Sequence, residues 1–217
     1  MAGGFDDRRD DAAHAKAIER VEGSFRDVYL TLVSIIQGVA LGFLIQAIGA
    51  DYRDIGLDKA GRAVAAFLAI VVIWQEYAVG STMYAWIPGP VDALVPFLLG
   101  AGQGVMIAAL DAPIAEFLFL TILMWGTGFI AAINYAVHAK RARLATTRES
   151  QKVIALHPRT LPILDAIGLT GVICMLGYCL SGLPQPHPAV FSWLLVALII
   201  GLVASAHWRW ARPMRPH

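Results

Sequence analysis

Apolar and polar stretches alternate along the chain in a pattern that predicts six membrane-spanning helices. The clearest apolar stretch is Val28–Ile48, which runs 21 residues without a charged side chain. An α-helix rises about 1.5 Å per residue, so this stretch is long enough to cross a hydrocarbon core of roughly 30 Å. Polar residues or proline-containing turns separate the apolar stretches from one another. The later apolar stretches predict five more spans, at about Ala63–Trp86, Val91–Ala109, Ile114–His138, Pro162–Ser181 and Val190–Ala206.

The composition fits a protein whose surface faces lipid. Hydrophobic residues make up 58% of the chain, charged residues 15%, and the mean hydropathy is +0.62. Soluble domains carry about a quarter charged residues. We therefore predict an all-α, integral membrane bundle of six transmembrane helices. It comprises an N-terminal cytosolic extension at 1–27, a transmembrane domain at 28–206 and a basic cytosolic tail at 207–217.

Positively charged residues predict which side of the membrane each end occupies. Of the 17 Lys and Arg residues, all but Arg53, Lys59 and Arg62 lie in the N-terminal extension, in the 139–161 segment or in the tail. An even number of spans puts these three segments on one side, and basic residues favour the cytosolic side. We expect both termini in the cytosol of a multi-pass protein of the cell inner membrane.

The first span has two different sides. With 100° between successive residues, one side carries Thr31, Ser34, Gln37, Gly38, Leu41, Gly42 and Ile45. The other side carries Val33, Ile36, Ala40, Phe43 and Leu44. Lipid does not favour Gln, Ser and Gly, so the first side predicts contact with another helix or with a water-filled path. We expect this helix at the centre of the bundle and take Ser34, Gln37, Gly38, Leu41, Gly42 and Ile45 as candidate pore-lining or helix-packing residues.

Polar residues inside the later spans form a second candidate set. Its members are Trp74, Gln75, Glu76, Trp125 and Asn134. Glu76 is the most informative of them, because a carboxylate within a span is costly and usually faces the protein interior. By helical angle it shares a face with Ala65, Ala69, Val72 and Gly80. Two interpretations stay open: Glu76 handles ions or protons, or it is a structural residue hydrogen-bonded to Gln37.

The remaining acidic residues and the known sequence motifs give little indication of a functional site. The acidic residues Asp92, Asp111, Glu116 and Asp165 fall at or near predicted span ends, where we expect them to cap helices or to meet headgroup water. The sequence contains no metal-binding, nucleotide-binding or catalytic motif. We therefore predict no enzyme activity, no cofactor, no metal and no nucleic acid partner. The expected partners are membrane lipid and either further copies of this chain or other membrane subunits.

The start of the first span resembles a known family. Phe25-Arg26-Asp27, with Arg20 before it, is similar to the Phe-Ser-Asp motif of the six-helix potassium channels typified by the lysosomal potassium channel and its bacterial relatives. Trp74 stands where that family has a Trp followed shortly by His. Arg26 replaces the Ser, no Gly follows Asp27, and the His is absent. A second alignment places Gln37-Gly38-Val39 on an Asp-Gly-Val segment. The resemblance implies a tetrameric channel whose first helix lines the pore.

These observations lead to three functional hypotheses. The first is an oligomeric protein that conducts or transports ions, with the first helices around an axis and Ser34, Gln37, Leu41 and Ile45 facing the path. The second is a non-catalytic accessory or scaffold subunit of a larger membrane complex, because the loops are short and no catalytic motif is present. The third is a small transporter that uses Glu76 as a proton site.

Overall fold

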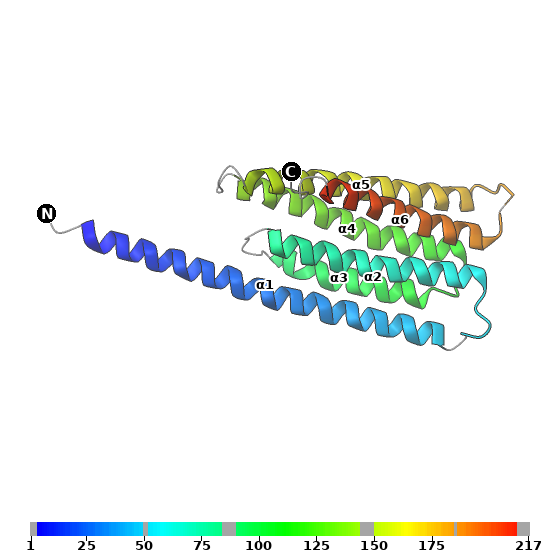
Figure 1. The fold of residues 1–217 in the computed structure, drawn as a ribbon. Coiled ribbons are helices and arrows are strands. Elements are labelled where there is room, and N and C mark those ends of the chain that lie inside the picture. Colours follow the sequence, from blue (N-terminus) through cyan, green and yellow to red (C-terminus); the bar gives the residue numbers. More distant parts are fainter. Residues whose placement is uncertain (1–3, 50–51, 84–89, 144–149, 185, 212–217) are drawn as a thin grey trace.

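The described part of the chain is helical throughout, apart from short connections. The structure is a computed structural model that describes residues 4–49, 52–83, 90–143, 150–184 and 186–211. These residues contain no strand. Six helices follow one another, and Figure 1 labels them: α1 (Gly4–Gly49), α2 (Leu57–Met83), α3 (Pro90–Ala108), α4 (Ile114–Arg143), α5 (Ser150–Leu180) and α6 (Pro188–Ala211).

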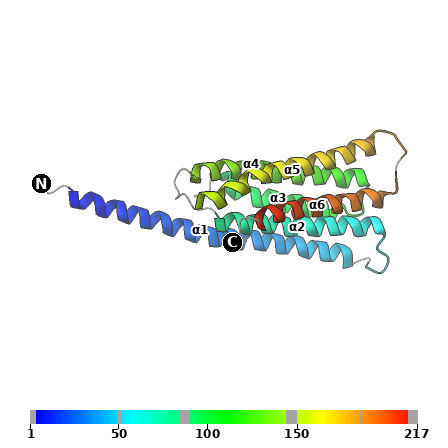
Figure 2. The same cartoon turned by 45° about the horizontal axis from the view of Figure 1, so that its top comes forward.

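The helices run side by side and form two layers. Figures 1 and 2 show α1, α2 and α3 on one side of the bundle and α4 and α5 on the other, with α6 beside α2 and α5. The most extensive contacts are those of α4 with α5 and of α2 with α6. Successive helices point in opposite directions, so α1 begins and α6 ends at the same end of the bundle. The short connections at residues 52–56 and 109–113 lie at the opposite end.

Helices α1, α4 and α5 continue into segments predicted to be polar extensions or connections. The domain boundary predicted after residue 27 lies inside α1, which runs unbroken through 46 residues and projects past the other helices in Figures 1 and 2. The predicted 139–161 connection is largely helical, since α4 ends at Arg143 and α5 begins at Ser150. The physical reason is composition: Ala, Arg, Lys and Glu, which are strong helix formers, are frequent in these polar segments.

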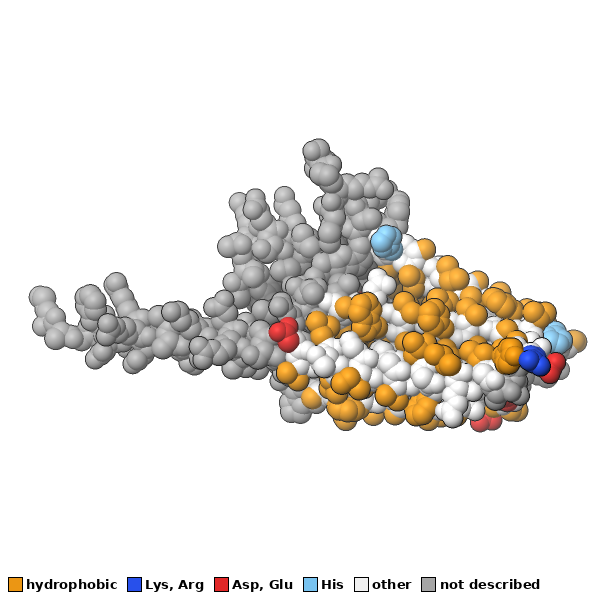
Figure 3. Space-filling model, turned by 60° about the horizontal axis from the view of Figure 1, so that its bottom comes forward, with side chains coloured by type: hydrophobic (Ala, Val, Ile, Leu, Met, Phe, Trp, Pro, Cys, Tyr) orange, Lys and Arg blue, Asp and Glu red, His pale blue; other side chains and the backbone are white. Residues whose placement is uncertain are grey.

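Apolar side chains cover the outside of the bundle. Ile35, Phe97, Ile130 and Ile200 are each more than half exposed, and Figure 3 shows orange side chains spread over the described face. Soluble monomers rarely expose apolar patches of this extent. Four segments are long and apolar enough to cross a membrane: Asp27–Gly49, Ile114–Asn134, Leu161–Leu180 and Pro188–His207. The fold is therefore that of a multi-pass membrane protein, and Ala93–Ala108 of α3 is a shorter apolar helix.

The buried side of α1 differs from the predicted one. Val33, Ala40 and Leu44, expected on the lipid side, are almost fully buried against α2 and α3. On the side expected to face the bundle only Gln37 is buried and Leu41 is half-buried, whereas Ser34, Gly38, Gly42 and Ile45 are exposed. Within one chain, α1 therefore lies at the edge of the bundle and not at its centre. The reason is that a ridge of small and branched apolar side chains packs against neighbouring helices as well as small polar residues do.

A glycine of α3 permits this packing. A Cβ atom at Gly100 would lie 2.4 Å from Cγ2 of Ile36 in α1, which is closer than two carbon atoms approach. At Gly38, Gly42 and Gly104 a Cβ would meet nothing within 4 Å. Among Gly38, Gly42, Gly100 and Gly104, only Gly100 is the site of a close approach between two helices of this chain.

Candidate functional site

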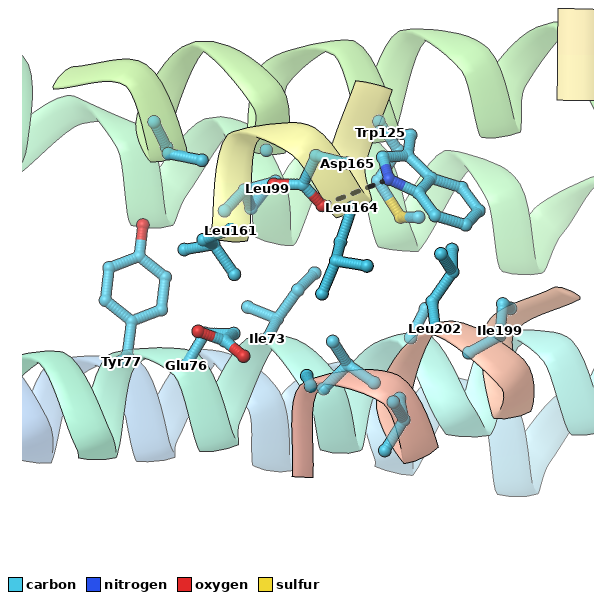
Figure 4. Close-up of a pocket in the computed structure, with 18 of the residues that line it drawn as sticks. Ile73, Glu76, Tyr77, Leu99, Trp125, Leu161, Leu164, Asp165, Ile199 and Leu202 are labelled. Atoms are coloured by element: carbon cyan, nitrogen blue, oxygen red, sulfur yellow. Dashed lines mark hydrogen bonds between the residues drawn. The ribbon is translucent and has the colours of Figure 1, made fainter. Parts of the chain in front are cut away.

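A cavity of about 200 Å³ lies inside the bundle, between the α2 side and the α4–α5 side. Most of its lining is apolar, and side chains from all six helices reach it. Figure 4 shows Ile73 of α2, Leu164 of α5 and Leu202 of α6 around this space. An apolar enclosure of this kind is the usual setting of a small-molecule site when a few polar groups converge on it.

Two carboxylates from different helices enter the cavity. Glu76 approaches from α2 and Asp165 from α5, and Figure 4 shows them on opposite sides of the same space. Both carboxylates line the same cavity, so the charge of one acts on the other across it. Like charges that share an apolar site repel each other strongly, because apolar walls screen charges less than water does. The pair is therefore a place where a positive charge would be held favourably.

The spacing of small residues along α2 explains how Glu76 reaches the cavity. Ala65, Ala69, Val72 and Glu76 recur at helical spacing and all line it, as predicted from their shared face. The short side chains of Ala65 and Ala69 leave room in the part of the cavity that extends along α2 away from the carboxylate. Opposite them, α4 contributes three further small residues, Gly128, Ala131 and Ala132.

Asp165 is held in place from α4. Nε1 of Trp125 donates a hydrogen bond to Oδ1 of Asp165 at 3.3 Å, drawn as a dashed line in Figure 4. The indole ring of Trp125 lies directly against Gly168, one helical turn after Asp165. A Cβ at Gly168 would be 2.0 Å from Cζ2 of that ring. Gly168 therefore makes the space that allows the indole to reach the carboxylate.

The other residues of the second candidate set divide into two groups. Asn134 lines the cavity, as does Trp125. Gln75 and Trp74 are exposed instead, and Nε1 of Trp74 donates to Oγ of Ser34 in α1 at 3.3 Å. Tyr77, next to Glu76, also lines the cavity, and its ring packs edge-on against Tyr29 of α1 with the ring centroids 5.6 Å apart.

Gln37 has a partner that the sequence analysis did not single out. Nε2 of Gln103 in α3 donates to Oε1 of Gln37 at 2.9 Å, and both side chains are buried. Gln103 lies in the glycine-rich stretch of α3, and a polar side chain inside an apolar helix is the signal by which the sequence could have pointed to it.

At the start of the apolar part of α1, Asp27 is exposed and its backbone oxygen accepts a hydrogen bond from the Thr31 hydroxyl. The side chain of Phe25 lies outside the described part of the chain.

Asp165 lies near the start of the candidate span Leu161–Leu180, as predicted, but the expectation that it caps a helix is wrong. That expectation placed the start of the fifth span at Pro162, whereas α5 begins at Ser150. Asp165 is therefore well inside the helix, and its side chain contacts Trp125 and the cavity. The signal that would have corrected the expectation is the helix-forming composition of residues 150–160, which moves the helix start away from Asp165.

A buried ionic network joins four elements at the end of the bundle far from the chain termini. The guanidinium of Arg62 in α2, 3% exposed, binds both carboxylate oxygens of Asp58 one turn earlier. It also donates to the backbone oxygens of Leu110 and Ala112 in the α3–α4 connection and lies over the Phe117 ring of α4, 5.4 Å from its centroid. Ser192 of α6 donates to Asp58. We call this set the Arg62 network.

The site contains no clustered metal ligands within the described residues: no three His, Cys, Asp or Glu side chains gather there. No match was found when the chain was compared with protein-family models, with curated proteins and with solved structures. The resemblance to the potassium channel family thus stays a prediction that depends on Phe25, Asp27 and Trp74.

Proposed function

We propose that the protein is a membrane transporter that exchanges cations for protons, with Glu76 and Asp165 as the binding carboxylates. One observation carries the proposal. Two acidic side chains from opposite sides of the bundle converge on one apolar cavity of about 200 Å³. Ionisable residues inside membrane helices are rare, and they commonly belong to ion or proton pathways.

Carboxylates in apolar surroundings are expensive to keep ionised, and two in one site also repel each other. A bound proton or a bound cation relieves both costs. Because the two occupants compete for the same oxygens, binding of one favours release of the other. That competition is the elementary requirement for exchange.

We further propose that all six helices cross the inner membrane, with both termini in the cytosol. The support is the distribution of basic residues, nearly all of which lie in the segments at the end where α1 begins and α6 ends. In this arrangement the carboxylates lie in the cytosolic half of the bundle. The Arg62 network then lies at the outer face.

Replacing Glu76 with glutamine tests the proposal. Proteoliposomes with an acidic interior are diluted into alkaline medium, and an internal pH dye follows proton efflux after addition of Na⁺, K⁺ or ammonium-type cations. We expect cation-stimulated efflux from wild type, and a decrease of about tenfold or more for Glu76→Gln and for Asp165→Asn, because each change removes a charge that the site needs.

Glu116→Gln is the matched control, because it makes the same chemical change at an exposed position at the start of α4. It should leave the efflux rate unchanged. The proposal is wrong if no cation stimulates efflux from wild type, or if Glu76→Gln and Glu116→Gln proteoliposomes release protons equally fast.

A second candidate function is supported by the exposed side of α1. Gly38, Gly42 and Ile45 form an exposed stripe on α1, next to Ser34, which is exposed and accepts a hydrogen bond from Trp74. Small residues on a membrane helix favour close contact with another helix. We propose, as the alternative, that this stripe is where copies of the chain meet around an ion path, or where the chain docks as an accessory subunit.

The mass of the native particle, measured after gentle detergent extraction, distinguishes these alternatives. A homo-oligomer of two to four copies that Gly38→Leu dissociates would support the meeting of copies. Co-purification with other polypeptides in a fixed ratio would support the accessory role. A monomer unaffected by Gly38→Leu would exclude both.

A further inference from the structure

We propose that the cation taken by this cavity is an organic ammonium with a compact apolar body, rather than a bare metal ion. The inference rests on the proposed function and names its class of substrate. It depends on three features of the cavity: its size, the chemistry of its walls, and the position of the carboxylates along its length.

The cavity is too large for a dehydrated metal ion alone. Its volume is about 200 Å³, whereas a water molecule occupies about 30 Å³ of the liquid and an apolar cavity of about 150 Å³ accommodates benzene. A ligand that fills it therefore has a ring or a short branched chain in addition to its charged group.

The walls match an apolar body. Apart from Glu76 and Asp165, the described lining is mostly aliphatic and aromatic. The hydroxyl of Thr121 donates to its own helix, to the backbone oxygen of Phe117 at 2.8 Å. Small inorganic cations bind compact shells of about six oxygen ligands, whereas the lining oxygens other than the two carboxylates, on Asn134, Thr121, Tyr29 and Tyr77, are distributed along the cavity on α4, α1 and α2. An ammonium ligand needs fewer, because methyl or methylene groups already surround its charge and the rest of the molecule gains from burial.

Aromatic side chains near the carboxylates add a second attraction for an ammonium group. Trp125, Tyr77 and Tyr29 all line the cavity, and Figure 4 shows Tyr77 beside Glu76 and Trp125 beside Asp165. The faces of aromatic rings attract quaternary and primary ammonium ions. Metal ions that keep their water shell gain much less from such rings.

The cavity is polar at one end and apolar at the other. Glu76 and Asp165 lie toward the end where the chain begins and ends, together with Leu161 and Ala206. Ala65, Met106 and Leu195 line the part nearer the Arg62 network. A ligand with the ammonium at one end and a ring at the other thus fits in one orientation, with the ring toward the Arg62 network.

Binding of benzyltrimethylammonium to the purified full chain in a neutral detergent tests the inference. Isothermal titration gives the dissociation constants for this probe, for tetramethylammonium and for Na⁺. We expect the benzyl compound to bind at least about tenfold more tightly than tetramethylammonium, which carries the same charge without the ring. Glu76→Gln with Asp165→Asn should weaken its binding by about tenfold or more.

Two glycines of α4 provide a matched pair that tests the cavity itself. Gly128 lines the cavity and Gly126 does not, and a Cβ at either position would meet nothing within 4 Å. Gly128→Leu fills the binding space and should weaken binding of benzyltrimethylammonium by about tenfold or more. Gly126→Leu makes the same change outside the cavity and should bind as wild type does.

The outcomes separate this inference from the proposed function. Equal affinity for benzyltrimethylammonium and tetramethylammonium, or equal affinity of the Gly128→Leu and Gly126→Leu variants, would overturn the inference. If Na⁺ or K⁺ still drives carboxylate-dependent proton efflux, the proposed function stands and the substrate class is wrong. If the probe binds as expected but no cation drives efflux, the site stands and transport is wrong.

Discussion

Replacing Arg62 with methionine is expected to lower the free energy of unfolding by about 3 kcal/mol or more. The guanidinium is 3% exposed and binds Asp58, two backbone oxygens and the face of Phe117. Methionine keeps much of the volume but supplies none of these hydrogen bonds. The backbone oxygens of Leu110 and Ala112 lose a donor, and the Asp58 carboxylate loses its counter-charge. Titration of the detergent-solubilised protein with sodium dodecyl sulfate measures the loss.

Lys59→Met is the control for this prediction. Nζ of Lys59 binds Asp111 at 2.8 Å, and Asp111 is largely exposed. The Lys59 side chain is itself only 11% exposed, but its partner is solvated and methionine keeps the buried aliphatic stem, so the expected loss is about 1 kcal/mol or less. An Arg62→Met protein as stable as Lys59→Met would show that the Arg62 network does not hold this end of the bundle together. Adding Asp58→Asn to Arg62→Met should recover part of the loss, because no unpaired carboxylate then remains.

Replacing Gly168 with alanine is expected to damage both the packing of α4 on α5 and the carboxylate site. The new Cβ would lie 2.0 Å from the Trp125 ring, so the indole or the helix must move. Overpacking of this kind costs about 1–3 kcal/mol. The movement also removes the hydrogen bond from Trp125 to Asp165. Thermal unfolding should therefore occur at lower temperature, and cation-stimulated proton efflux should fall by about tenfold, since the carboxylate loses its orienting partner.

Gly177→Ala, in the same helix, makes the same change where a Cβ would meet nothing within 4 Å. Alanine favours a helix over glycine by about 0.5–1 kcal/mol, so this control should be as stable as wild type or slightly more so. If the two variants unfold at the same temperature and transport equally well, the contact of Gly168 with Trp125 has no importance for packing or function.

The sequence predicts the helices well because their signals are local. Long apolar stretches with polar ends define Asp27–Gly49, Ile114–Asn134, Leu161–Leu180 and Pro188–His207 without reference to the rest of the fold. The face that Glu76 shares with Ala65 and Ala69 follows from helical geometry alone, and all three residues line the cavity.

What the sequence does not predict depends on contacts between distant segments. Both sides of α1 are compatible with helix packing, and only the neighbouring helices decide that Val33 and Leu44 are buried while Ser34 and Gly38 are exposed. Asp165 becomes a candidate site residue because α4 brings Trp125 to it and α2 brings Glu76 to the same cavity. Arg62 directly precedes the predicted second span, so the sequence suggests an exposed residue in a connection. Its network forms only when α2, α4 and α6 pack together.

The unbroken length of α1 has a mechanical consequence. Its first half projects past the other helices, and its second half packs on α2 and α3 and contributes Tyr29 to the cavity lining. An α-helix bends only gently unless a proline, a π-bulge or an inserted group breaks it. A tilt or rotation of the projecting half therefore also moves Tyr29, because both belong to one unbroken helix. The close contact of Ile36 with Gly100 is the point about which the helix would pivot. A protein that bound the projecting half of α1 could therefore change the shape of the cavity by moving this helix.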